Sequence, residues 1–172
     1  MTTTRVPSRP TSQPQTADAS MSGAPLLAVL RPHHFGASVP DLESAIEWYR
    51  RILGFEPESQ ADIDKIPARV AFLRRGNFRI ELFEVPGAAA LPHDRRIPNL
   101  DLRTHGNKHL CFEVVNVAAA VAALRAATVD IAFEVVVDGA PVAFIRDVCG
   151  NLIELIEPFR SDVATDTLAN SL

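Results

Sequence analysis

The chain has 172 residues, of which 47% are hydrophobic, so it is long enough for one globular domain or for two small modules that share a core. Its net charge of −4 provides no general attraction to nucleic acid or to anionic membranes, and no apolar run approaches the roughly 20 residues that span a bilayer. The two cysteines, Cys111 and Cys149, are too few for a disulfide framework, so we expect a cytoplasmic protein.

The first half of the chain predicts a tail, a strand, a helix and three further strands. Residues 1–25 are rich in Thr, Ser, Pro and Gln and carry no secretory signal, so we expect a disordered tail there. A strand over residues 34–39 ends at Pro40, and Asp41 is a good N-cap for a helix over residues 42–53, where apolar residues recur with helical spacing. Three strands are then predicted at residues 55–60, 68–74 and 78–84.

The second half predicts the same order of elements. A strand over residues 109–115 is followed by Asn116, a second N-cap, and by a helix over residues 117–127. Asp138-Gly139 is typical of a hairpin turn. The three strands of this half are predicted at residues 131–137, 141–147 and 152–157, and a second weakly patterned tail is expected at 160–172.

The two halves also share sequence. Val70-Ala71-Phe72-Leu73-Arg74 recurs as Val142-Ala143-Phe144-Ile145-Arg146, and Ile80-Glu81-Leu82 recurs as Ile153-Glu154-Leu155. Such a repeat indicates a duplicated βαβββ unit, and therefore an α+β fold. The expected single domain covers residues 28–159, with modules at 28–86 and 106–159 and a connector at 87–105.

Each half has a histidine on its first strand and a glutamate on its last, which makes His34, Glu81, His109 and Glu154 candidate metal ligands. A carboxylate in an apolar row of a strand is costly unless it is paired, protonated or bound to metal. If the halves pair about a pseudo-twofold axis, the four groups converge, and this donor set suits Zn²⁺, Ni²⁺, Co²⁺, Mn²⁺ or Fe²⁺. The alternative is four unrelated residues: glutamates paired with arginine and ordinary core histidines.

Five stretches carry a family resemblance: His34 to Leu42, Trp48 to Phe55, Ile80 to Glu84, Lys108 to Val114, and Asp147 to Leu155. Together they resemble the vicinal-oxygen-chelate superfamily, which includes glyoxalase I, methylmalonyl-CoA epimerase, extradiol dioxygenases and bleomycin-resistance proteins. The opening strand and helix are most similar to epimerase-like members. The resemblance implies a glyoxalase-like half-barrel around one divalent metal ion bound by the four candidate ligands, and a homodimer.

The same resemblance implies a metal-dependent isomerase, epimerase or lyase that stabilises an enolate of a small carbonyl or acyl-CoA substrate. The types it favours are methylmalonyl-CoA epimerase and lactoylglutathione lyase, with Glu81 and Glu154 as the groups that move the proton. Extradiol dioxygenases use two histidines and one glutamate, so a ligand at Glu81 favours the four-ligand group. Two alternatives stay open: an Fe(II)-dependent extradiol-type dioxygenase, and a metal-free small-molecule-binding resistance protein.

The long polar connector holds the candidate substrate-binding residues Arg95, Arg96 and Arg103. As part of a lid, these guanidinium groups would face a carboxylate or phosphate of the substrate. The alternative is a solvated linker. Cys111 is in phase with His109 on its strand, so it either faces the site or fills the core.

Overall fold

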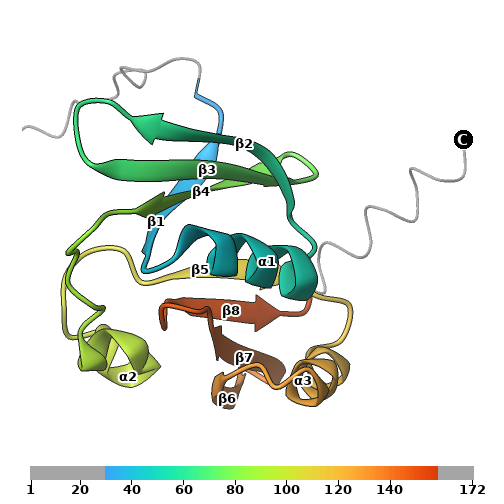
Figure 1. Cartoon of the computed structure of the whole chain (residues 1–172). Coiled ribbons are helices and arrows are strands. Elements are labelled where there is room, and N and C mark those ends of the chain that lie inside the picture. The colour runs from blue at the N-terminus through green and yellow to red at the C-terminus, as the bar shows by residue number, and fades with distance from the viewer. Residues whose placement is uncertain (1–29, 159–172) are drawn as a thin grey trace, which may run out of the picture. The chain divides into compact units, whose positions relative to one another are not determined.

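The computed structural model describes residues 30–158, and its strands form two four-stranded mixed sheets, one from each half of the chain (Figure 1). The strand orders are β1-β4-β3-β2 and β5-β8-β7-β6, so the same topology occurs twice. In each sheet the first and last strands of the module are parallel neighbours, and the remaining pairs are antiparallel. This arrangement confirms the predicted pair of βαβββ modules.

The first module contains β1 (His34–Val39), α1 (Leu42–Leu53), β2 (Glu56–Ile63), β3 (Ala68–Arg75) and β4 (Phe78–Glu84). Helix α1 begins where predicted, because the Asp41 carboxylate accepts a hydrogen bond of 2.7 Å from the backbone N–H of Ser44. It ends at Gly54, whose φ of 66° is the left-handed conformation that glycine adopts without strain.

The second module contains β5 (His109–Glu113), α3 (Val117–Ala126), β6 (Ile131–Val137), β7 (Ala140–Arg146) and β8 (Leu152–Ile156). Asn116 caps α3 by accepting a hydrogen bond of 2.7 Å from the backbone N–H of Ala119. The predicted hairpin turn is present between β6 and β7. Asp138 and Gly139 have φ values of 49° and 83°, and two successive positive φ values define a type I′ turn.

Two strand boundaries differ from the sequence expectation by more than one residue. Strand β2 runs to Ile63 rather than to residue 60, and its first seven residues are exposed, so no apolar alternation marks its end. Its length is set instead by pairing with β3, which continues to the partners Ile63 and Ala68. Strand β5 ends at Glu113, two residues early, and Val115 is 95% exposed in the loop that follows.

The connector is folded rather than a solvated linker. It contains the short helices η1 (His93–Arg96) and α2 (Pro98–Asp101). Asp101 is 1% exposed, and its carboxylate lies against the Arg95 guanidinium and 3.4 Å from the Lys108 ammonium group. No helix within residues 30–158 is long and apolar enough to cross a membrane. The tails expected at residues 1–25 and 160–172 lie outside the described residues.

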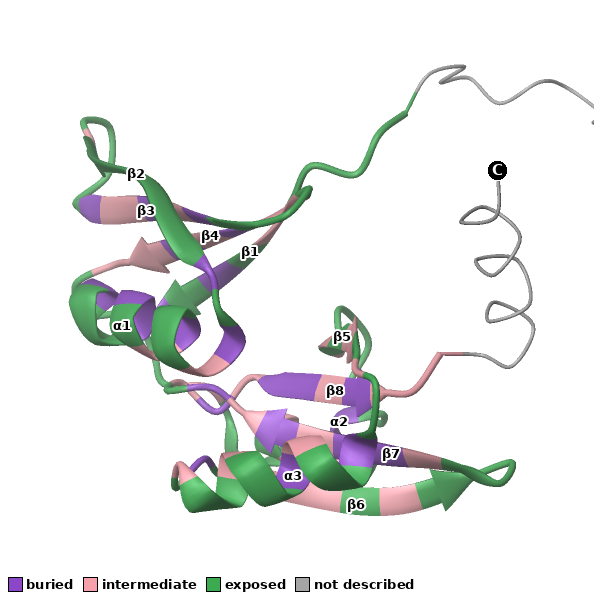
Figure 2. Ribbon diagram, turned by 90° about the vertical axis from the view of Figure 1, so that its right-hand side faces the viewer, coloured by how far each residue is buried: buried purple, intermediate pink, exposed green. Residues whose placement is uncertain are grey.

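The two modules share a core on the side of the sheets that carries α1. Leu42 and Tyr49 of α1 belong to the same buried cluster as Ile153 and Leu155 of β8, and Figure 2 shows buried residues on both elements. The Tyr49 hydroxyl donates a hydrogen bond of 2.8 Å to the buried Asp147 carboxylate of the second module. The sheet faces opposite to this core are therefore the ones left for the candidate ligands.

Candidate metal centre

The first pair of candidate ligands lies on the outer face of the first sheet. Nε2 of His34 on β1 is 3.0 Å from Oε2 of Glu81 on β4, and their side chains are 35% and 19% exposed. Gly36 is the register partner of Glu81, and a Cβ built on Gly36 would lie 4.0 Å from Oε2 of Glu81. Because Gly36 has no side chain, the Phe83 ring packs beside it, with Cε2 of Phe83 3.4 Å from the same Cβ position.

The second pair has the same geometry on the outer face of the second sheet. Nε2 of His109 on β5 is 3.0 Å from Oε2 of Glu154 on β8. The register partner of Glu154 is Cys111, so a thiol occupies the position that Gly36 has in the first module. Burial and the neighbouring Glu154 carboxylate raise the pKa of the Cys111 thiol to about 12. The thiol therefore stays protonated at neutral pH and is no nucleophile.

A phenylalanine stands beside each histidine. The ring centroids of His34 and Phe72 are 5.3 Å apart, those of His109 and Phe144 are 5.1 Å apart, and both contacts are edge-on. Phe72 and Phe144 are the register partners of the two glutamates. We call each set of His, Glu and Phe a half-site. Sequence reasoning missed the two phenylalanines as site residues, although the Val-Ala-Phe repeat contained the signal.

The geometry of each half-site fits two coordination positions of one metal ion. An imidazole nitrogen and a carboxylate oxygen that bind one ion at about 2.1 Å, at right angles, are roughly 3 Å apart. The observed separation is 3.0 Å in both half-sites. A neutral imidazole and a carboxylate are also the ligand types that divalent transition metals accept.

The structure brings the candidate ligands together within each half, but not between the halves. Among residues 30–158, no three His, Cys, Asp or Glu side chains gather as a metal-binding group. The physical reason is that the modules pack through the sheet faces that carry the shared core, which directs the two half-sites outward. Strands β1 and β5 each form an edge of their sheet.

Two of the three connector arginines predicted to bind substrate have structural contacts. Besides its contact with Asp101, Arg95 donates from Nη2 to the backbone carbonyl of Asn107. The backbone carbonyl of Arg96 accepts a hydrogen bond of 2.7 Å from Nε of Arg146. Arg103 is exposed. Arg95 and the backbone of Arg96 thus contribute to holding the connector on the second module.

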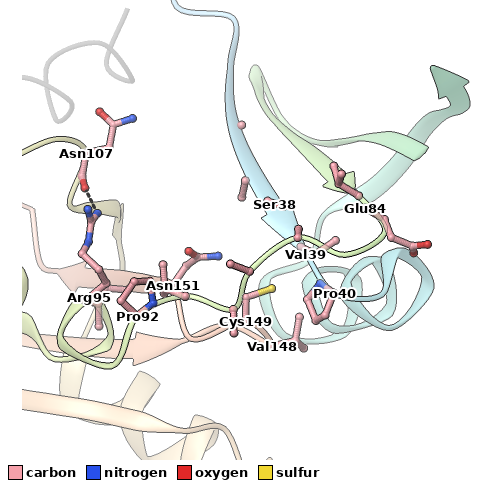
Figure 3. Close-up of a pocket in the computed structure, with 18 of the residues that line it drawn as sticks. Ser38, Val39, Pro40, Glu84, Pro92, Arg95, Asn107, Val148, Cys149 and Asn151 are labelled. Carbon is pink, nitrogen blue, oxygen red and sulfur yellow. Dashed lines mark hydrogen bonds between the residues drawn. The ribbon is translucent and has the colours of Figure 1, made fainter. Parts of the chain in front are cut away.

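A cavity of about 850 Å³ lies between β1, the connector and the beginnings of β5 and β8 (Figure 3). Gly36 of β1 and His109 of β5 both line this cavity, so it touches one ligand-bearing strand of each module. Cys149 also lines it, but burial and the nearby Asp147 carboxylate raise the pKa of this thiol to about 12. The cavity offers room for a small molecule beside His109.

Two βαβββ modules, each with a His and Glu pair on the outer face of its sheet, define a protein of the vicinal-oxygen-chelate class. Residues 31–155 match the model of the Glyoxalase/Bleomycin resistance protein/Dioxygenase superfamily, and the chain belongs to this superfamily. The crystal structure of the glyoxalase family protein from Enterococcus faecalis has a similar fold, with a TM-score of 0.64 and 22% identity over 74% of this chain and 97% of that chain.

Two relatives similar in sequence are named as epimerases. The chain is 33% identical over 132 residues to the mitochondrial methylmalonyl-CoA epimerase of Homo sapiens. The match covers 73% of this chain and 72% of the relative. It is also 33% identical over 122 residues to the 2-epi-5-epi-valiolone epimerase of an Actinomyces species. This match covers 62% of this chain and 63% of the relative. The two names share a reaction type and differ in substrate.

Proposed function

We propose that this protein is a metal-dependent epimerase that moves a proton on the carbon next to a carbonyl group of a small molecule. The observation that carries the proposal is the pair of half-sites, which place His and Glu 3.0 Å apart at equivalent positions of two duplicated sheets. The names of the two relatives support the reaction type, because both are epimerases of carbonyl compounds. An acyl-CoA thioester is the substrate class that the human relative suggests.

The metal site in this proposal is completed by a second copy of the chain. One half-site supplies two ligands, and a catalytic centre needs at least three. The pair His34 and Glu81 of one copy would join the pair His109 and Glu154 of another. Strands β1 and β5 are sheet edges beside these pairs, and such edges are available for association. When bound, a divalent ion would polarise the substrate carbonyl and stabilise the negative charge of an enolate.

The chain's own carboxylates move the proton in this proposal. We assign the role of base to Glu81, which has Gly36 as its register partner, whereas Glu154 lies beside the Cys111 thiol. Glu81 removes the proton from the carbon next to the carbonyl, which leaves an enolate. The carboxyl group of Glu154 then returns a proton to the opposite face of that carbon, which completes the inversion.

The test is metal analysis combined with proton exchange. Protein purified without chelators is examined by elemental analysis, stripped, and reloaded with single divalent metals. We expect it to exchange the α-proton of methylmalonyl-CoA for deuterium only when metal is present. The variants His34→Ala and His109→Ala should lose most of the metal and the exchange, while His93→Ala, a histidine of the connector, should keep both.

Other outcomes would contradict the proposal in distinct ways. Oxygen consumption with a catechol would indicate dioxygenase chemistry. A metal-free protein that binds small apolar molecules without exchange would indicate a resistance-type binder. Exchange that persists after complete metal removal would refute the metal dependence.

A further inference from the structure

The imidazole ring of His34 contacts a second histidine, His33, which precedes it in the chain. Nδ1 of His33 lies 2.7 Å from Nδ1 of His34, and the two ring centroids are 5.0 Å apart in an edge-on arrangement. His33 is exposed and lies directly before β1. Both nitrogens of the His34 ring therefore have a neighbour, His33 at Nδ1 and Glu81 at Nε2.

The contact between the two Nδ1 atoms requires that one of them donates a hydrogen and the other accepts it. A neutral imidazole has one N–H group and one nitrogen with a free lone pair. A metal bound at this half-site needs the lone pair of His34 at Nε2, because Nε2 is the nitrogen that faces Glu81. In that tautomer the hydrogen of His34 is on Nδ1, so His34 donates and Nδ1 of His33 accepts.

The other two neighbours of the ring do not select this tautomer. Phe72 packs edge-on against His34, but an apolar ring does not distinguish an imidazole nitrogen from a carbon. Glu81 does not select it, because an ionised carboxylate only accepts hydrogen bonds and Nε2 of this tautomer has no hydrogen to donate. A half-turn of the His34 ring about its Cβ–Cγ bond would exchange Nε2 for Cε1 and Nδ1 for Cδ2. The turned ring loses its hydrogen bond to His33, so this bond favours the orientation that directs Nε2 at Glu81.

The second half-site has a lysine where the first has His33. Lys108 precedes His109, and an ammonium group has no lone pair with which to accept a hydrogen bond. Its Nζ donates to two backbone carbonyls of the connector. His109 otherwise has the same Phe and Glu contacts as His34. The preceding histidine is therefore a feature of the first half-site alone.

We propose that His33 is a positioning residue for the metal. It accepts a hydrogen bond from Nδ1 of His34 and thereby fixes the tautomer and the ring orientation that present Nε2 to a divalent ion. The inference rests on the proposed function, because it takes His34 to be a metal ligand. A histidine ligand generally donates from its other ring nitrogen to such a partner, which orients the ring and strengthens metal binding. His33 itself touches neither the metal nor the substrate in this arrangement.

The experiment compares two nearly isosteric replacements of His33. In His33→Asn, the side-chain Oδ1 takes the place of the imidazole Nδ1 and accepts the hydrogen bond, whereas His33→Leu has a methyl group there. The affinity of stripped protein for Zn²⁺ is measured by competition with a chromophoric chelator, without substrate. We expect His33→Leu to weaken Zn²⁺ binding by about tenfold, the lower end of the effect of such partners, because water reaches the 35% exposed side chain of His34. His33→Asn should keep most of the wild-type affinity.

Two further measurements separate positioning from a general loss of structure. His93→Leu makes the same replacement at an exposed histidine of the connector and should bind Zn²⁺ like the wild type. In proton NMR spectra of the Zn²⁺-loaded protein, the Nδ1–H proton of His34 should give a downfield signal in the wild type and in His33→Asn. Without its acceptor in His33→Leu, this proton should exchange with water and its signal should broaden.

The outcomes separate this inference from the proposed function. If His33→Leu binds Zn²⁺ like the wild type, or if His33→Asn loses as much affinity as His33→Leu, the inference is overturned, and metal-dependent proton exchange would leave the proposed reaction standing. Because the titration needs no turnover, weaker binding in His33→Leu with recovery in His33→Asn supports the inference even in a protein without proton exchange, where only the proposed reaction fails. A wild-type protein with no affinity for Zn²⁺ would refute both.

Discussion

The two glutamates of the half-sites have different neighbours, although they occupy equivalent positions on β4 and β8. Glu81 adjoins Gly36, and Glu154 adjoins Cys111, whose thiol lies within hydrogen-bonding reach of its carboxylate. For single residues, the duplication therefore places a glycine beside one carboxylate and a thiol beside the other.

This difference predicts unequal losses from the same substitution. Glu81→Gln keeps an oxygen that can bind metal but removes the base, and we expect the exchange rate to fall by roughly a hundredfold or more, the usual contribution of general-base catalysis. Glu154→Gln should cost less in exchange rate. Deuterium exchange of methylmalonyl-CoA at equal metal content measures both. A larger loss for Glu154→Gln than for Glu81→Gln would reverse the assigned roles.

The candidate ligands were predictable from the sequence because each half repeats them in the same strand context. The repeat paired His34 with Glu81 and His109 with Glu154, and the structure has the members of each pair in contact. Phe72 and Phe144 were overlooked because an apolar residue in a strand is read as core. Which sheet faces pack against each other depends on contacts between distant segments, so the sequence could not predict that the half-sites lie apart.

At the scale of elements, the connector depends on one buried carboxylate. Asp101 closes α2, and Arg95 and Lys108, which lie before and after it, both approach its side chain. The Lys108 ammonium group also donates a hydrogen bond of 2.8 Å to the backbone carbonyl of Asp101. Periodicity gave no sign of this arrangement, because a single buried acid in a polar segment looks like any exposed one.

We predict that Asp101→Asn lowers the free energy of unfolding by about 3 kcal/mol, since removing one member of a buried ion cluster leaves the others uncompensated. The control is Asp130→Asn, which removes the ion pair with Arg146 at a site where the Asp130 side chain is 57% exposed. An exposed pair of this kind contributes about 1 kcal/mol or less. Urea unfolding of both variants measures the difference, and equal losses would show that burial of Asp101 is unimportant.

At the scale of the whole molecule, two outward half-sites on one chain make a specific prediction for mixtures of inactive variants. A copy with His34→Ala keeps the half-site of His109 and Glu154 intact. A copy with His109→Ala keeps the half-site of His34 and Glu81 intact. If the metal centre forms between copies, a mixed dimer contains one complete centre and one that lacks both histidines. We expect mixing and re-equilibration to restore up to about a quarter of the wild-type exchange rate.

The control for this mixture is the pair His34→Ala and Glu81→Ala. Both variants damage the first half-site, so every centre in every mixed dimer lacks one ligand, and no activity should return. Light scattering of the same samples reports the mass of the assembly. A monomer mass at micromolar concentration, or no recovery in the first mixture, would place the centre elsewhere.

The hydrogen bond between Tyr49 and Asp147 has a consequence for how this duplicated chain folds. Its two ends come from different repeats, and the same Asp147 carboxylate also accepts hydrogen bonds from the backbone N–H groups of Cys149 and Asn151, which shape the turn before β8. Loss of α1 would remove the Tyr49 hydrogen bond from this buried carboxylate and would expose Ile153 and Leu155 to water. We therefore expect that neither repeat folds as an independent unit. The duplication doubled the length of the chain, yet we expect the two copies to unfold in one cooperative transition.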